Sequence, residues 1–281
     1  VLGKLRIHQN SKITNATLDK GINNLNATQN FSSISYYFEE AEKGDNLVLN
    51  LKENPLNRYL KFGLHYDELY KSAVLLNLTQ KKFLLKNDVV SLDVILGDNF
   101  RYNLNYYIDN GFYWSFGFNS RYNRFNKNVA TDFSDGQILT NLGLKSINVD
   151  FSDFTNQIYL QTVFAQKFLI GAGLEHKHLK IRSSTLENVG GVISSDDYFS
   201  VFGNLKYDSF DQKYFPKRGW YFSGDFHTTA YTKDGHDRLS QFSIAKADAG
   251  IVKTFYKTIS LKVQSEAGFT IGKEGLSLIH I

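Results

Sequence analysis

Large apolar side chains occupy every second position through most of the chain. The stretch FRYNLNYYIDNGFYWSFGFNSRYN, residues 100–123, shows the pattern most clearly. Its apolar series is Phe100, Tyr102, Leu104, Tyr106 and Ile108, and it resumes at Phe112, Trp114, Phe116 and Phe118. Successive side chains of a strand point to opposite faces, so this spacing predicts two strands with one aromatic and one polar face. The residues Asp109, Asn110 and Gly111 between them are typical of a hairpin turn.

The same period of two recurs from Arg58 almost to the end of the chain. It predicts about a dozen strands of about 9 to 16 residues, the opening hairpin included, joined by turns rich in Gly, Asn and Asp. Besides the two strands above, the expected strands cover 60–67, 70–79, 89–98, 138–150, 155–164, 167–182, 198–208, 219–231, 241–255 and 258–271.

The length of these strands favours a membrane-spanning barrel over a soluble sandwich. Strands of globular proteins usually have about 5 or 6 residues, whereas a tilted strand needs about 9 to 11 residues to cross a bilayer. The second face is also too polar for a shared core: it carries Arg101, Asn103 and Asn105 on one strand and Lys262 and Glu266 on another. A closed antiparallel barrel in lipid covers the apolar face and leaves no unpaired edge. A soluble all-β fold is the alternative.

Aromatic residues gather near the ends of the expected strands. Rings with a polar tip suit the two interfaces of a membrane, so we expect these positions to form girdles against outer-membrane lipids. Cross-strand aromatic pairing in an ordinary sheet would produce a weaker version of the same composition. The expected interface residues are Tyr66, Tyr106, Phe112, Trp114, Trp220 and Tyr231.

Residues 1–56 follow a different pattern and form a separate unit. Leu18, Leu25 and Phe31 recur at roughly helical spacing, with Thr14 or Asn15 as N-cap. Two short alternating strands follow, and Pro55 closes the unit. The sequence therefore predicts a helix packed on a hairpin, a small α+β module.

Composition removes several classes of function. The net charge is +4 and no basic tract is present, which argues against nucleic-acid binding. The chain has no cysteine, which excludes disulfides, thiolate metal sites and cysteine nucleophiles. Because the chain starts at Val1 without a signal-peptide pattern, we expect an internal fragment. The last six residues, LSLIHI, match the translation of a transposase adapter, so we expect 276–281 to be an artefact.

The most specific motif lies in YDSFDQKYFPKRGWYFSG, residues 207–224. It resembles the Asp…Phe-Pro-x-x-Gly signature of the BamA-like outer-membrane superfamily, also called the bacterial surface antigen family. The matching positions are Asp211, Phe215, Pro216, Arg218 and Gly219. Such a turn suits a barrel rim, since proline belongs at a strand start and glycine permits a tight reversal.

The resemblance implies a domain order. Residues 1–56 look like the C-terminal part of a polypeptide-transport-associated (POTRA) domain, in the periplasm. Residues 57–275 look like an incomplete outer-membrane barrel with about 12 of about 16 strands. The barrel is most similar to that of Bacteroidetes patatin-like phospholipases, in which a patatin domain precedes one POTRA domain. The superfamily's Arg-Gly-Phe-type lumen loop is not seen in the sequence.

The resemblance also implies a function. The chain would anchor, and help translocate, an upstream patatin-like domain, with a client polypeptide pairing on the POTRA edge strand. A general outer-membrane assembly insertase and a passive porin are the alternatives. Patatins use a Gly-x-Ser-x-Gly elbow that this chain lacks, so we expect no catalytic residue here, and no metal or cofactor.

Other candidate chemistry has a simpler explanation. His176 and His178 share a strand face and could bind a metal, but we favour solvated or lumen-facing histidines. His227 with Ser223 could form a hydrolase pair, and we interpret both as polar lumen residues. Calcium at Asp196, Asp197, Asp208 and Asp211 lacks the spacing of a known loop. Charge pairing across a wet lumen is the expectation for Arg101, Arg121, Lys206, Lys262, Asp93, Asp225 and Glu266.

Overall fold

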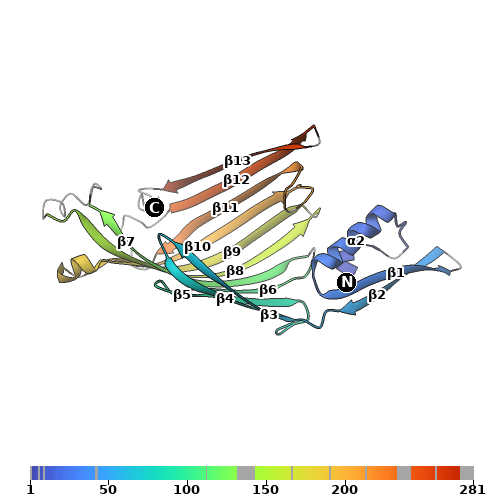
Figure 1. The fold of residues 1–281 in the computed structure, drawn as a ribbon, viewed down its shortest axis with the longest axis horizontal. Helices are drawn as coiled ribbons and strands as arrows, with labels where there is room; N and C mark the ends of the chain where they lie inside the picture. Colours follow the sequence, from blue (N-terminus) through green and yellow to red (C-terminus); the bar gives the residue numbers. More distant parts are fainter. Residues whose placement is uncertain are drawn as a thin grey trace.

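The computed structural model describes residues 2–5, 7–8, 10–41, 44–111, 113–131, 143–165, 167–189, 191–212, 214–232, 242–256 and 258–272. Within these ranges the chain forms two parts, a small N-terminal module and one large antiparallel sheet (Figure 1). No helix in the described ranges is long and apolar enough to cross a membrane.

The N-terminal module is a helix pair beside a hairpin. It contains α1 (Leu2–Leu5), α2 (Asn15–Ala27), β1 (Phe31–Ala41) and β2 (Gly44–Glu53). The expected cap is present, because the Thr14 hydroxyl accepts a hydrogen bond from the Thr17 amide at 3.2 Å. Leu5, Leu18 and Leu25 are almost completely buried and form the core of the module. The two helices approach closely at Gly21, where a β-carbon would lie 2.6 Å from the Leu5 carbonyl oxygen.

The large sheet contains eleven strands, each paired antiparallel with the next one along the chain. The strands are β3 (Arg58–Asp67), β4 (Lys71–Lys81), β5 (Asp88–Gly97), β6 (Arg101–Ile108), β7 (Ser115–Ala130), β8 (Ser146–Phe164), β9 (Phe168–Arg182), β10 (Val192–Asp208), β11 (Arg218–Thr232), β12 (Phe242–Phe255) and β13 (Ile259–Gly272). A 3₁₀ helix, Ser184–Val189, lies in the β9–β10 connection. This meander of long strands is the predicted architecture.

The sheet is curved but not closed. Figure 1 shows a trough whose two edge strands are β3 and β13. The expected count of about twelve barrel strands is therefore one too high for the described residues, and barrel closure is not observed in them. The difference arises at β8: residues 146–150 and 155–164, expected in two separate strands, lie in the single strand Ser146–Phe164.

The two faces of the sheet differ as the sequence predicts. Cross-strand register places Phe118, Ile158, Leu174 and Val201 side by side, and the polar residues between them on the other face. We call the first face the apolar face and the second the polar face. Leu174 is 56% exposed, whereas the Glu175 side chain beside it is only 10% exposed. The polar face is therefore the sheltered inner side of the trough, and the apolar face is its exposed outer side.

Hairpin connections alternate between the two ends of the sheet. One end carries the turns at 82–87, 109–114, 165–167, 209–217 and 256–258, and we call it the module end because β3 leaves the N-terminal module there. The other end, the distal end, includes the longer connections 131–145, 183–191 and 233–241. The hairpin turn expected at Asp109, Asn110 and Gly111 lies at the module end, where Lys4 forms an ion pair of 2.9 Å with Asp109.

Further contacts hold the module against the sheet. Lys81 donates to the Thr28 carbonyl at 2.9 Å, and Lys82 pairs with Glu53 at 2.5 Å. Together with the Lys4–Asp109 pair, these lysines join α1, the C-cap of α2 and β2 to the end of β4 and to the β4–β5 and β6–β7 turns. The contacts border a cavity of about 440 Å³ between the two parts. In the described ranges, charged and polar side chains thus help to hold the module against the sheet.

Candidate functional site: the rim turn and the polar face

The motif turn at the module end connects β10 and β11 and is stabilised by its aspartate. The Asp211 carboxylate accepts hydrogen bonds from the amides of Lys217 at 2.9 Å and Arg218 at 3.4 Å. The Asp211 amide donates to the Arg218 carbonyl at 3.3 Å. Next to it, the Ser209 hydroxyl bonds both the amide and the carbonyl of Trp220. Pro216 stands just before β11 begins at Arg218, where no ladder donor is needed.

The motif glycine is required by the close approach of two backbones. Gly219 has φ +116°, and a β-carbon at this position would lie 2.5 Å from the Ser209 carbonyl oxygen. Other residues are strongly disfavoured at such a φ. Phe215, also at positive φ, projects into solvent with 89% of its surface exposed. The motif therefore builds a rigid turn that presents an aromatic side chain at the rim.

We expect the Gly219→Ala substitution to destabilise the protein by about 2 kcal/mol, because it adds backbone strain and a clash with Ser209. Urea unfolding of the complete protein in lipid vesicles measures the loss. Gly63→Ala is the matched control, since a β-carbon on Gly63 of β3 would contact nothing within 4 Å. Equal stability of the two variants would contradict the assigned role of Gly219.

We expect the conformation of the motif turn to depend on pH through the Asp211 carboxylate. The Lys217 amide, followed by that of Arg218, lowers the pKa of Asp211 below its ordinary value near 3.8. A lowered folded-state pKa means that Asp211 contributes stability above its unfolded-state pKa and loses it as pH falls through the folded-state value. Below about pH 4 we expect the turn to loosen.

Tryptophan fluorescence can follow this change, because the chain has only two tryptophans and Trp220 adjoins the turn. In a Trp114→Phe background, Trp220 emission should change between about pH 4 and 2. The Asp211→Asn variant should lack this transition. A transition that persists in Asp211→Asn would assign it to another group.

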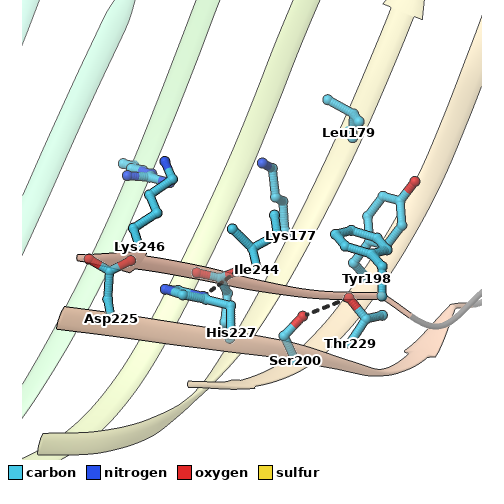
Figure 2. Close-up of a pocket in the computed structure, with 12 residues that line it drawn as sticks. Lys177, Leu179, Tyr198, Ser200, Asp225, His227, Thr229, Ile244 and Lys246 are labelled. Carbon is cyan, nitrogen blue, oxygen red and sulfur yellow. Dashed lines mark hydrogen bonds and ion pairs between the residues drawn. The ribbon is translucent and has the colours of Figure 1, made fainter. Parts of the chain in front are cut away.

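The polar face carries a pocket between β7 and β12 (Figure 2). The pocket has a volume of about 200 Å³. At its base Glu175 accepts a hydrogen bond from Gln157 at 2.5 Å and lies 3.7 Å from His227. Beside it Lys177 lies 3.7 Å from Asp153. The pocket is lined by Arg121, Glu175, Lys177, Leu179, Tyr198, Ser200, Asp225, His227, Thr229, Phe242, Ile244 and Lys246.

Donors in and beside this pocket lack protein partners. The Arg121 Nε and the Tyr198 hydroxyl are buried without a hydrogen bond to the described residues. Tyr198 is only 4% exposed, and Figure 2 shows its hydroxyl directed away from Ser200 and Thr229. A wet cavity or a bound polar segment satisfies such groups, whereas a dry core would not. The arrangement therefore suits a hydrated passage.

The charged residues expected in the lumen do share the polar face, but they do not pair with one another. Arg101 instead stacks on the Tyr70 ring at 3.7 Å, and Asp93 accepts hydrogen bonds from Asn77 and Asn103. Among the described residues, no ion pair joins any two of the expected seven. The observed pairs involve Glu175, His227, Lys177 and Asp153. The strand alternation could have indicated all of these positions, but only cross-strand register brings the partners together.

The histidines His176 and His178 do not lie on the polar face. Both rings contact one carboxylate oxygen of Asp197, at 3.1 and 2.9 Å, and His176 packs on Phe199. The lumen-facing alternative is therefore wrong, and the solvated one fits their partial exposure near the distal end. No cluster of three metal-ligating side chains suited to a metal ion occurs in the ranges that the structure covers.

The other chemical candidates also occupy structural roles. His227 stacks on Phe202 at 5.2 Å and lies four residues from Ser223, with no hydrogen bond between them in the described structure. Asp196 accepts a hydrogen bond from the Ser194 hydroxyl, and Asp208 accepts a hydrogen bond from the Phe210 amide. These contacts give the two carboxylates hydrogen-bond partners in the described structure.

Comparison with known proteins decides the family. Residues 45–280 match the OMP85 superfamily. The chain belongs to the OMP85 superfamily. No curated protein matches the sequence. Among solved structures, CdiB from Escherichia coli is similar with TM-score 0.67 and 10% identity, covering 97% of this chain and 52% of that one.

Two further solved structures share the fold. BamA from Haemophilus ducreyi lacking POTRA domains 1–3 has TM-score 0.63 and 14% identity, covering 97% of this chain and 53% of that one. CdiB from Acinetobacter baumannii has TM-score 0.56 and 13% identity, covering 94% and 49%. The chain thus spans about half the length of each structure. The resemblance to the BamA-like superfamily is confirmed, and the fold is that of an outer-membrane β-barrel.

The OMP85 superfamily belongs to the bacterial outer membrane, and an exposed apolar face with a sheltered polar face is the arrangement that a barrel in lipid requires. The aromatic positions expected at the interfaces fall at both ends of the sheet. Trp114 and Trp220 lie at the module end, and Tyr66 and Tyr231 at the distal end, each about half exposed or more. Tyr106 is more sheltered, because its hydroxyl donates to Asp88 at 2.8 Å. Phe112 lies outside the described residues.

Proposed function

We propose that this chain is the membrane module of an OMP85 protein that moves a polypeptide into or across the outer membrane. The observation that carries the proposal is the combination of a polar, sheltered inner face with an apolar, exposed outer face on long antiparallel strands. The unpartnered donors of Arg121 and Tyr198 support a path for polar groups. A translocated chain presents many backbone donors and acceptors, which such a face can satisfy.

The N-terminal module would be the end of a periplasmic POTRA domain. In the described residues its sheet has only two strands, so β1 and β2 each leave an edge unpaired. An extended client can add a strand to such an edge by main-chain hydrogen bonds. The exposed Tyr36 and Phe38, whose rings meet edge to face at 6.2 Å, would then provide side-chain contacts for the client.

The absence of cysteine allows a direct test of this edge. A photoactivatable or thiol-reactive group at Ser35→Cys on β1 should cross-link to the client in cells that express the complete protein. The same group at Asn23→Cys, on the exposed side of α2, is the matched control. Cross-linking at both positions alike, or at neither, would contradict client binding by strand addition.

The passenger would be an upstream patatin-like phospholipase domain, as the sequence resemblance implies. On this proposal the chain anchors the enzyme and helps to export it, and the hydrolytic residues belong to the other domain. Extending the reading frame in the 5′ direction tests it. A Gly-x-Ser-x-Gly elbow upstream supports the anchor, and several POTRA repeats without a hydrolase would support an assembly insertase instead.

A passive porin is the third candidate function, and a conductance measurement distinguishes it from the two polypeptide-handling functions. A porin conducts small ions steadily through an open lumen, whereas a polypeptide path is occupied or plugged for most of the time. We expect the complete protein in planar bilayers to show rare, irregular openings. Stable conductance steps through an open lumen would favour the porin.

A further inference from the structure

The side chains on the outer face of the sheet change from apolar to positively charged towards the distal end. Along β9 the outward residues Ile170, Ala172 and Leu174 are followed by His176 and His178. The next two outward residues on this strand are Lys180 and Arg182. The strand therefore passes from an apolar belt through two histidines to a cationic end, all on the same face.

Neighbouring strands extend this cationic end sideways. Unbroken register places Arg124, Ser152 and Lys180 in one row across β7, β8 and β9, and Asn126, Asp150 and Arg182 in the next. We call these two rows the distal cationic rows. They contain three cations and one carboxylate.

That carboxylate is already engaged. Asp150 forms a bidentate pair with Arg124, at 3.0 Å to Nε and 2.8 Å to Nη2. No ion pair joins Lys180 or Arg182 to another residue among those described. Arg182 is exposed and Lys180 partly so. Two positive charges on the outer face thus have no protein counter-charge in the described structure.

The height of the rows matches a lipid headgroup layer. Phe168 begins β9 at the module end of the apolar face, and Lys180 follows twelve residues later, about 40 Å along the strand. At a typical tilt of about 40°, this is about 30 Å along the membrane normal, beyond an apolar band about 25 Å tall. The side chains of the rows therefore lie beside headgroups rather than acyl chains.

We propose that the distal cationic rows bind the phosphate groups of lipids in the outer leaflet. The inference rests on the membrane placement in the proposed function, with the module end in the periplasm. Arginine and lysine are the side chains that bind phosphate best, and each one near an anionic lipid surface strengthens binding. The ligand chemistry is a phosphorylated glycolipid headgroup, such as the phosphorylated glucosamine of lipid A.

The test measures binding of fluorescent lipid A to the complete protein in phosphatidylcholine nanodiscs. Each cation near such a surface contributes about 1 kcal/mol, or about five-fold in affinity. The Lys180→Gln/Arg182→Gln variant should therefore bind lipid A about 25-fold more weakly than the unmodified protein. Lys206→Gln/Lys262→Gln, which removes two cations from the polar face, is the matched control and should change affinity less than two-fold.

A second measurement compares the binding of dephosphorylated lipid A. This lipid should bind the unmodified protein about as weakly as lipid A binds the outer-face variant. Equal binding of the two lipids, or equal loss in both double variants, would overturn the proposal while the protein remains inserted. Failure of every variant to enter nanodiscs would overturn the membrane placement itself, and this inference with it.

Discussion

The Leu174→Arg variant is expected to lose about 2 to 4 kcal/mol of stability in the membrane, among the largest effects we predict for a single substitution. Leu174 lies on β9 in the row Phe118, Ile158, Leu174 and Val201, and 56% of its surface is exposed. In a soluble fold an arginine at such an exposed site would cost little. In lipid the charge must leave water, and its row neighbours Ile158 and Val201 carry no carboxylate to pair with it. Urea unfolding in lipid vesicles, followed by the heat-dependent shift of the protein on gels, measures the loss.

The matched control is an arginine on the opposite face. Gln157 lies one residue before Ile158 on β8 and contacts Glu175 on the polar face at 2.5 Å. A Gln157→Arg substitution gives the new charge water and a carboxylate partner, so we expect a change of less than about 1 kcal/mol. If Leu174→Arg and Gln157→Arg were equally harmless, the apolar face would not meet lipid, and a soluble fold would be favoured.

The Asp88→Ala variant is expected to lose about 2 to 3 kcal/mol, because several donors lose one shared acceptor. Asp88 is 1% exposed and begins β5 at the module end. Its carboxylate accepts hydrogen bonds from the amides of Phe83, Leu84 and Leu85, at 2.6 to 2.9 Å, and from the Tyr106 hydroxyl at 2.8 Å. The side chain thus ties the β4–β5 turn to the neighbouring strand β6.

Two control variants test whether the loss of stability comes from the hydrogen bonds of Asp88. Asp98→Ala removes an exposed carboxylate just beyond the other end of β5 and should change the unfolding free energy by less than about 0.5 kcal/mol. Tyr106→Phe removes only one of the four donors and should cost about 1 kcal/mol. An Asp88→Ala protein as stable as Asp98→Ala would mean that water replaces the carboxylate without loss.

Several features of the fold could be read from the sequence because they are encoded locally. The pleat of a strand turns every second side chain to the same face, so the alternation around Phe116 and Phe118 indicates strands and faces without knowledge of their partners. The turn residues Asp109 to Gly111 and the N-cap Thr14 act over three or four positions. The motif around Gly219 is equally local, since its glycine and proline serve one turn.

Other expectations failed because they depend on pairing between distant strands. The sequence left His176 and His178 either solvated or facing the lumen, and strand register places them on the outer face with Leu174. The expected lumenal charges share one face, yet Arg101 meets a tyrosine and Asp93 meets asparagines. The pair of Glu175 and His227 joins β9 to β11 across β10, so only the assembled sheet could reveal it.

The sequence by itself thus determined the strands, their two faces and the rim turn, because each follows from side-chain direction and backbone freedom over a few residues. The tertiary structure alone decided which charged groups meet, that two expected strands join into β8, and that the β1–β2 hairpin stays apart from the large sheet. These outcomes depend on strand register and sheet curvature, which arise from contacts between residues far apart in the chain.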